Sequence, residues 1–477
     1  MNSVWQQLTL SNLQLYQWRG ASYLYQLVGL LQSWRRGSLL LQWAEPIGAL
    51  LVALVFALAP FVSNALIGVL LFAGAAFWVL LTLSDETVYP QRGQQQGLPL
   101  RVTPIHLVVL LYWSIAIVAT ALSPVKVAAA KGLVKLTLYL LFFALMARIL
   151  RSPRFRSWII TLFLLISLIV SVYGLRQWFF GADALATWVD PTSTSAKLTR
   201  VYSYLGNPNL LAGYLIPAVT LSLAAVFAWQ GWLPKALAVT TFVVNSACLI
   251  VTFSRGGWIG FLVCLFVFLV LLVYWYSVQL PPKWRTLAMP VVLGGSATVI
   301  VLAAMFVEPV RDRVASMFVG REDSSNNFRI NVWSAVIEMI RDRPFIGIGP
   351  GNDAFNKIYP LYMRPRFSAL SAYSILLEVA VETGLIGFSC FLWLLIVTVN
   401  QGIEQLNRLR TLANPDGFFL MGAIASMFGM LAHGFVDTVW YRPQVNTLWW
   451  LTIAIIASFY IPVSANTPKL GSYEVEG

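Results

Sequence analysis

Runs of about twenty apolar residues recur along the chain, separated by short polar breaks. Each run is long enough to cross the hydrocarbon core of a bilayer, which is about 30 Å thick. No water is present in lipid to satisfy the peptide groups, so each run must be helical. The pattern predicts an all-α, polytopic transmembrane bundle of about twelve spans. The expected spans are 47–63, 65–83, 104–123, 132–150, 157–175, 209–229, 235–253, 257–278, 287–307, 384–400, 417–437 and 446–464.

These runs divide the chain into five parts. Residues 1–46 contain arginines among broken amphipathic runs, which indicates an interfacial segment and not a cleavable signal. Nine spans are expected in 47–307, an extracytoplasmic loop of short amphipathic helices in 308–383, and the last three spans in 384–464. Residues 465–477 would form a cytoplasmic tail.

Composition and charge support this class. Of the 477 residues, 58% are hydrophobic and 11% are charged, and the mean hydropathy is +0.74. Soluble domains carry about 25% charged residues. The net charge of +13 does not indicate nucleic-acid binding, because Lys and Arg collect in cytoplasmic loops. Counting them places both termini in the cytoplasm and the long loops outside.

The stretch TFSRGGWIG, residues 252–260, sets an arginine into the shortest break between two runs. Ser254 is a natural N-cap for the second helix, whose start offers unpaired N–H groups and a positive dipole end. Arg255 adds a fixed charge, and Gly256 and Gly257 would let a ligand approach the backbone. These features are typical of an anion site. The alternative is that Arg255 extends to lipid phosphates at the interface.

A second marked stretch, YSYLGNPNLLAGYLIP, covers residues 202–217. Asn207, Pro208 and Asn209 form a turn and helix-start signal, and we expect Asn209 to cap the span that follows. A well-capped helix is the simpler interpretation of this stretch. A role in supporting the outer site is the alternative.

The long outer loop contains apolar residues at four-residue spacing, which predicts an amphipathic helix over 326–344. Arg329 and Trp333 follow the same spacing on a neighbouring stripe. The basic residues of this loop would meet either lipid headgroups or an anionic substrate.

Two carboxylates stand close to the span that follows the loop. Glu378 and Glu382 are four residues apart and share a helix face. Charges near a span are costly unless they are paired or in water. We therefore expect either pairing with Arg255 or Arg329, or an interfacial helix start with both carboxylates in water.

Residues suited to metal binding are few. His433 and Asp437 stand at i and i+4 and can hydrogen-bond, which would fix the imidazole tautomer. His106 is the only other histidine, and the three cysteines lie within apolar runs. We expect no metal and no cofactor.

Four motifs in order resemble the O-antigen ligase-like membrane proteins. They are GNPNLLAGYL (206–215), TFSRGGWIG (252–260), FRINVWSAVIEMIRDRPFIGIGPGNDAF (328–355) and LLEVAVETGLIGF (376–388). The whole chain is most similar to the branch of that superfamily named for bicarbonate transport and inorganic-carbon accumulation. That similarity rests on SAYSILLEVAVETG and on the basic, aromatic N-terminal segment.

The resemblance implies roles for single residues. The family transfers a glycan from an undecaprenyl-diphosphate carrier to an acceptor in the outer leaflet. Arg255 and Arg329 match the arginines thought to hold the diphosphate. Tyr373 stands where the family has its key histidine, and a phenol is a poor proton acceptor near neutral pH. His433 is a second candidate for that role.

Three functions are compatible with these motifs. The first is a bicarbonate transporter with an outward anion site built on Arg255 and Arg329. The second is a metal-free glycan ligase or polymerase that uses a polyprenyl-diphosphate donor. The third is a non-catalytic membrane scaffold. Membrane lipids are the expected partners in each case, and the oligomeric state is left open.

Overall fold

The computed structural model describes residues 2–11, 28, 30–85, 102–182, 200–306, 311, 320 and 324–461. Within them the secondary structure is helical, with no strand. The predicted tail 465–477, much of the predicted N-terminal segment and most of 308–323 lie outside the described residues.

A helix occupies each of the twelve positions where a span is expected. These helices are α6 (Ala44–Leu58), α7 (Asn64–Leu83), α8 (Pro104–Ala121), α9 (Lys126–Ile149), α10 (Pro153–Phe180), α11 (Pro208–Ala228), α12 (Trp232–Val251), α13 (Arg255–Tyr276), α14 (Pro282–Phe306), α18 (Ile375–Thr411), α19 (Asp416–Val436) and α20 (Pro443–Ser458). Within the described part of the chain, nine of them are long and apolar enough to cross a membrane. The exceptions are α6, α14 and α20. The prediction of an all-α polytopic membrane protein is confirmed.

The remaining helices are short or lie outside the bundle. They are α1 (Asn2–Leu8), α4 (Gln32–Gly37), α5 (Leu39–Gln42), η2 (Ser203–Leu205), α16 (Ser324–Asp342), α17 (Asn352–Ile358) and η4 (Tyr359–Leu361). The helix expected over 326–344 corresponds to α16, and within the described part of the loop α17 and η4 are two further short helices. Amphipathic spacing therefore predicted the correct type of structure for the loop.

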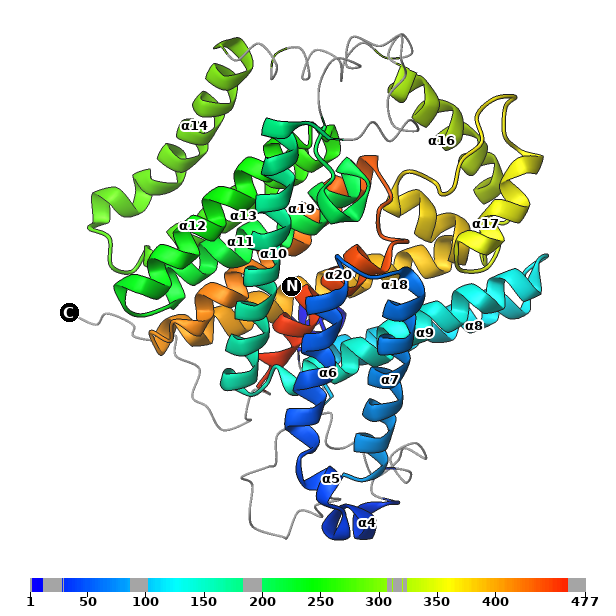
Figure 1. Ribbon diagram of the computed structural model, residues 1–477, viewed down its shortest axis with the longest axis horizontal. Coiled ribbons are helices and arrows are strands. Elements are labelled where there is room, and N and C mark those ends of the chain that lie inside the picture. Colours follow the sequence, from blue (N-terminus) through cyan, green and yellow to red (C-terminus); the bar gives the residue numbers. More distant parts are fainter. Residues whose placement is uncertain are drawn as a thin grey trace.

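The core of the bundle is formed by α11, α13 and α19, which pack on one another, and α20 packs beside them (Figure 1). Nearly every side chain of α11 and α20 is buried. Helices with no lipid-facing side are apolar all round, which is why their sequences show no amphipathic stripe. Helix α14 stands apart from this core in the same view.

Helix α18 begins earlier than the expected span 384–400, at Ile375. Its backbone breaks at Gly384, whose φ is +67°. A Cβ there would lie 2.2 Å from the carbonyl carbon of Phe345, so only glycine allows this approach. The loop that follows α16 crosses α18 at this break, and Leu385 N donates to Pro344 O at 2.7 Å.

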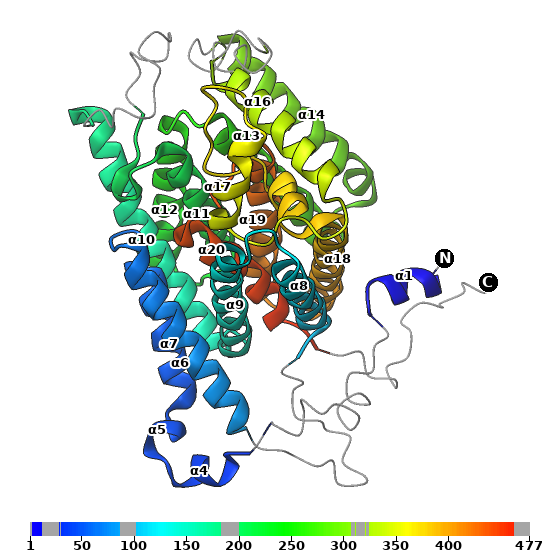
Figure 2. The same cartoon turned by 90° about the vertical axis from the view of Figure 1, so that its right-hand side faces the viewer.

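The helices place the predicted outer elements at one end of the bundle. Figures 1 and 2 show α16 at one end and α4 and α5 at the other. Because consecutive helices run in opposite directions, the start of α13 and the end of α19 lie at the α16 end. The sequence-based expectation that Arg255 and the long loop share one face agrees with this arrangement.

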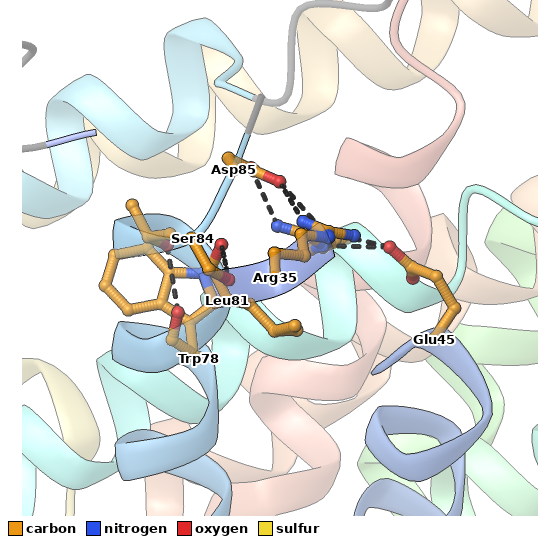
Figure 3. Close-up of polar contacts among 8 residues, drawn as sticks. Arg35, Glu45, Trp78, Leu81, Ser84 and Asp85 are labelled. Atoms are coloured by element: carbon orange, nitrogen blue, oxygen red, sulfur yellow. Dashed lines mark hydrogen bonds and ion pairs between the residues drawn. The ribbon is translucent and has the colours of Figure 1, made fainter. Parts of the chain in front are cut away.

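A buried ion network lies at the α4 end (Figure 3). Arg148 of α9 contacts Asp85 at 2.9 Å and Glu45 at 3.0 Å, and Arg35 contacts Asp85 at 2.8 Å. Two guanidinium groups thus face two carboxylates, which offsets the cost of burying charge. The network ties α4, α6 and the end of α7 to α9.

The N-terminal helix α1 lies against α18. Trp5 Nε1 donates to Asn400 Oδ1 at 3.1 Å, and Ser11 Oγ donates to Glu404 Oε1 at 2.7 Å. Val4 and Trp5 remain exposed. A short helix with an apolar exposed side beside a span fits the expected interfacial position.

Candidate functional site

The candidate site at the α16 end is centred on Asp437, the residue after α19. Asn209 Nδ2 donates to Asp437 Oδ2 at 2.7 Å, and Arg329 Nη2 lies 3.6 Å from the same oxygen. The backbone N–H of Thr438 donates to Asp437 Oδ1 at 2.8 Å. The Asp437 side chain is only 6% exposed, so these contacts compensate for its loss of water.

Arg200 is a member of this site that the sequence pattern did not reveal. Its Nη2 donates to Asn209 Oδ1 at 3.0 Å, and its Nε donates to Thr252 O at 3.0 Å. Burial lowers the pKa of Arg200 to about 10; the charge of Asp437 raises it, and those of Arg255 and Arg329 lower it. Arg200 therefore stays charged at neutral pH and lies within electrostatic reach of two further arginines.

Arg255 begins α13 and is half-buried. The predicted cap is present, because Ser254 Oγ accepts from Gly257 N at 3.1 Å. Phe253 holds a left-handed φ of +49°, which turns the chain sharply between α12 and α13. The turn thus places the Arg255 charge at the positive end of a helix dipole, as the sequence predicted.

Gly256 and Gly257 are buried against protein, and not against open space. A Cβ on Gly256 would lie 2.8 Å from His433 Cδ2, and one on Gly257 would lie 2.5 Å from Ala212 Cβ. The sequence pattern suggested that these glycines allow close approach of a ligand. The structure explains them by the close packing of α13 on α19 and α11.

His433 is fully buried where α19 meets α11 and α13. Its ring packs closely against Gly213 and Gly256, where an added Cβ would collide with it. Neither ring nitrogen has a hydrogen-bond partner among the described residues. The expected bond to Asp437 does not form, because α19 ends at Val436 and Asp437 adopts an extended backbone that leaves the helix face.

Helix α16 delivers Arg329 to the site. Arg329 Nε donates to Val436 O at 2.8 Å, and Nη1 donates to Ser325 Oγ at 2.5 Å. One turn further along α16, Trp333 Nε1 donates to Tyr373 O at 3.3 Å. The stripe of Arg329 and Trp333 that the sequence showed thus faces the end of α19 and the start of α18.

Tyr373 lies close to this cluster, just before α18. Its φ is +51°, and its ring meets Phe328 edge-on at 5.1 Å between centroids. Burial raises the pKa of Tyr373 to about 12, with further raising by Asp437 and Tyr441 and lowering by Arg329. The phenol therefore stays protonated near neutral pH and is available as a hydrogen-bond donor.

Glu378 and Glu382 hold the loop, and neither forms an ion pair within the described residues. Glu378 Oε2 accepts from Ala372 N at 2.8 Å, and Glu382 Oε1 accepts from Gly351 N at 2.7 Å. The expected pairing with Arg255 or Arg329 is therefore not observed, and nor is an exposed helix start. Both carboxylates anchor loop backbone to α18.

The two asparagines of the NPN turn have different tasks. Asn207, and not Asn209, caps α11: its Oδ1 accepts from Asn209 N at 2.8 Å and from Leu210 N at 3.2 Å. The expected cap is thus shifted by two residues. The side chain of Asn209 instead forms hydrogen bonds to both Arg200 and Asp437.

The site contains no arrangement suited to a metal. Among the described residues, no three His, Cys, Asp or Glu side chains gather closely enough to hold an ion. The charged groups that do gather are Arg200, Arg255, Arg329 and Asp437. The arrangement can bind an oxyanion through guanidinium groups.

Comparison with known proteins adds a family. Residues 240–392 match the O-antigen ligase family. No curated protein matches the chain. The matched segment contains Arg255, Arg329 and Tyr373 but ends before Asp437, and it covers about a third of the sequence. The similarity to the O-antigen ligase family is therefore established for this segment of the membrane protein.

Proposed function

We propose that the protein binds the diphosphate of a polyprenyl-linked glycan at the α16 end and transfers the glycan to an acceptor. The observation that carries this proposal is a linked cluster: Arg329 lies 3.6 Å from Asp437, Asn209 joins Asp437 to Arg200, and Arg255 lies within electrostatic reach of Arg200. We further propose that this end of the bundle faces the outside of a bacterial inner membrane.

The charge balance of the cluster favours a dianion. Among the four groups, three are guanidinium groups that can donate to an anion and one is a carboxylate. A diester of diphosphate carries one negative charge on each phosphate, and guanidinium groups bind phosphate oxygens in pairs. The positive end of the α13 dipole adds to the same potential.

In glycan transfer the arginines would stabilise the leaving group. The acceptor hydroxyl forms a bond to the anomeric carbon of the donor while the bond to the diphosphate breaks. The electron pair leaves on the diphosphate, where charge-assisted hydrogen bonds stabilise it. The hydroxyl proton passes to water, because the ring of His433 is fully buried and cannot contact the acceptor, and we propose Tyr373 as a neutral hydrogen-bond donor to the substrate.

The role of Tyr373 can be tested by pH. Because its pKa is raised to about 12, the phenol is neutral up to a pH of about 10. We expect the ratio of diphosphate-lipid affinities between Tyr373→Phe and the parent protein to stay constant from pH about 6 to about 10. Binding isotherms measured across this pH range check that the ratio is constant. A ratio that changes near neutral pH would show that Tyr373 is ionised there.

Bicarbonate transport is the second candidate, and the burial of Arg200 favours it. A half-buried guanidinium suits a small ligand, and bicarbonate is an oxyanion that fits the same fork of donors. Bicarbonate is smaller than a diphosphate and can engage fewer of the three guanidinium groups, which is why we place transport second.

Reconstituted protein separates these functions. We expect Arg255→Ala and Arg329→Ala to weaken binding of undecaprenyl diphosphate by roughly tenfold to a hundredfold, since one hydrogen bond to a charged group contributes about 1.5–3 kcal/mol. Arg341→Ala is the matched control, because Arg341 is an exposed arginine on the same helix as Arg329. It should change the affinity less than about twofold.

The same vesicles test the alternatives. If the parent protein takes up labelled bicarbonate, loses uptake in both cluster variants and binds no diphosphate lipid, the glycan proposal is overturned in favour of transport. If neither lipid binding nor uptake depends on the arginines, the scaffold interpretation stands.

A further inference from the structure

A cavity lies close in sequence to Arg200, a member of the arginine cluster formed by Arg200, Arg255 and Arg329. It has a volume of about 300 Å³ and opens between the last turns of α10 and the segment 200–206. Its lining includes Tyr173, Arg176, Gln177, Phe180, Tyr202 and Tyr204. Aromatic faces combined with a few polar groups are typical of a small-molecule site.

The polar wall of the cavity is held in place by its own hydrogen bonds. Gln177 Oε1 accepts from Tyr202 N at 3.1 Å and from Ser203 N at 2.8 Å. Ser203 Oγ donates to Val170 O at 2.6 Å. Since Gln177 is only 7% exposed, these bonds fix the segment on α10 before any ligand arrives.

The aromatic wall presents tyrosine rings. The rings of Tyr173 and Tyr204 stack at 4.3 Å between centroids, and the Arg176 guanidinium lies 5.8 Å from the centroid of Tyr173. Tyr204 is 45% exposed despite this stacking. A sugar ring has an apolar C–H face and a polar edge of hydroxyl groups. Tyrosine offers the matching combination of an apolar ring and a hydroxyl, and Arg176 adds donors.

The cavity lies close to the arginine cluster along the chain. Tyr202 follows Arg200 by two residues, so their Cα atoms are at most about 7 Å apart. Val201 N between them donates to Val251 O at 3.4 Å, which ties the strip to the turn before α13. A ligand with phosphates on Arg200 would therefore have its next chemical group near the tyrosines.

We propose that this cavity binds a sugar ring of the glycan whose diphosphate occupies the arginine cluster. The inference rests on the proposed function, and it adds the part of the site that recognises the saccharide. The cavity would distinguish a sugar-bearing donor from the bare carrier lipid.

Two lipid probes test the inference on the full-length protein in nanodiscs. Undecaprenyl diphosphate reports on the arginine cluster, and undecaprenyl diphosphate bearing N-acetylglucosamine reports on both parts. We expect the sugar-bearing lipid to bind roughly tenfold more tightly in the parent protein, as one ring contact with hydrogen bonds supplies. Tyr204→Ala should remove this gain and leave the affinity for the bare lipid within about twofold.

Matched variants protect the result from folding artefacts. Trp158→Ala removes an exposed ring from the other end of α10 and should leave the gain intact. Tyr204→Phe keeps the ring and should retain most of the gain.

Each remaining outcome is decisive. The inference is overturned if the parent does not prefer the sugar-bearing lipid, if Tyr204→Ala keeps the preference, or if Tyr204→Ala weakens both lipids equally. If the bare lipid does not bind but the sugar-bearing one does, through Tyr204, the inference stands and the diphosphate proposal fails. If neither lipid binds, both are overturned.

Discussion

Gly132→Ala should strongly destabilise the protein, because the added methyl group would collide with the backbone of a packed loop. Gly132 of α9 faces the loop between α16 and α17, and a Cβ there would lie 1.8 Å from the carbonyl oxygen of Pro350. The backbone of Pro350 cannot shift aside as the end of a flexible side chain could. The loop must therefore move away from α9 and α18.

The displacement would break a defined contact. Gly351, the next residue of the loop, approaches Gly132 closely and donates its N–H to Glu382. We expect a loss of about 1–3 kcal/mol from overpacking, plus the cost of leaving the half-buried Glu382 carboxylate without its donor. The melting temperature of the purified protein in detergent measures this loss of stability.

Gly68→Ala is the matched control. Gly68 also lies within a helix, α7, but a Cβ there would meet nothing within 4 Å. Alanine should stabilise the helix by about 0.5–1 kcal/mol, so the two substitutions should shift the melting temperature in opposite directions. Equal shifts would mean that the loop is not seated on α9.

The spans could be predicted from sequence because each one is a local property: about twenty apolar residues in a row require a helix in lipid. The start of α18 was placed too late for a physical reason. Glu378 and Glu382 look too polar for a helix in the bundle. Their compensation comes from the N–H groups of Ala372 and Gly351, and the latter is a long-range contact that no local pattern reveals.

The site could be predicted only in part. Arg255 was found because a helix cap and two glycines surround it, and Arg329 because it sits on a periodic helix. Arg200 was missed because it lies in a polar loop with no periodicity. The one available signal was the position of Arg200, a basic residue two positions before the YSYLGNPN stretch. Its role depends on Asn209, which the turn pattern had assigned to capping α11.

The His433–Asp437 interpretation shows where periodicity misleads. Spacing of four residues predicts contact only while the helix continues. Here the helix ends at Val436, so the carboxylate turns away from the imidazole and toward Asn209 and Arg329. Helix ends are the least certain part of any pattern, and this site is built from them.

Asp437→Asn should destabilise the protein without ligand and increase the stabilising effect of an anion. The substitution keeps the shape of the side chain but removes the negative charge that acts on Arg200, while Arg255 and Arg329 remain. Breaking a buried ion pair costs about 3–5 kcal/mol because it leaves uncompensated charge. We therefore expect a clear fall in the melting temperature.

Inorganic pyrophosphate supplies the missing charge and distinguishes two roles for Asp437. If the carboxylate occupies the place of a ligand anion, pyrophosphate should raise the melting temperature of Asp437→Asn by more than that of the parent protein. Asp353→Asn is the control, because the pair of Asp353 with Lys135 at 3.1 Å is largely exposed and contributes less than about 1 kcal/mol. An equal response to pyrophosphate in Asp437→Asn and the parent would show that Asp437 only braces the arginines. The ligand would then bind on the outer side of the cluster, away from the carboxylate.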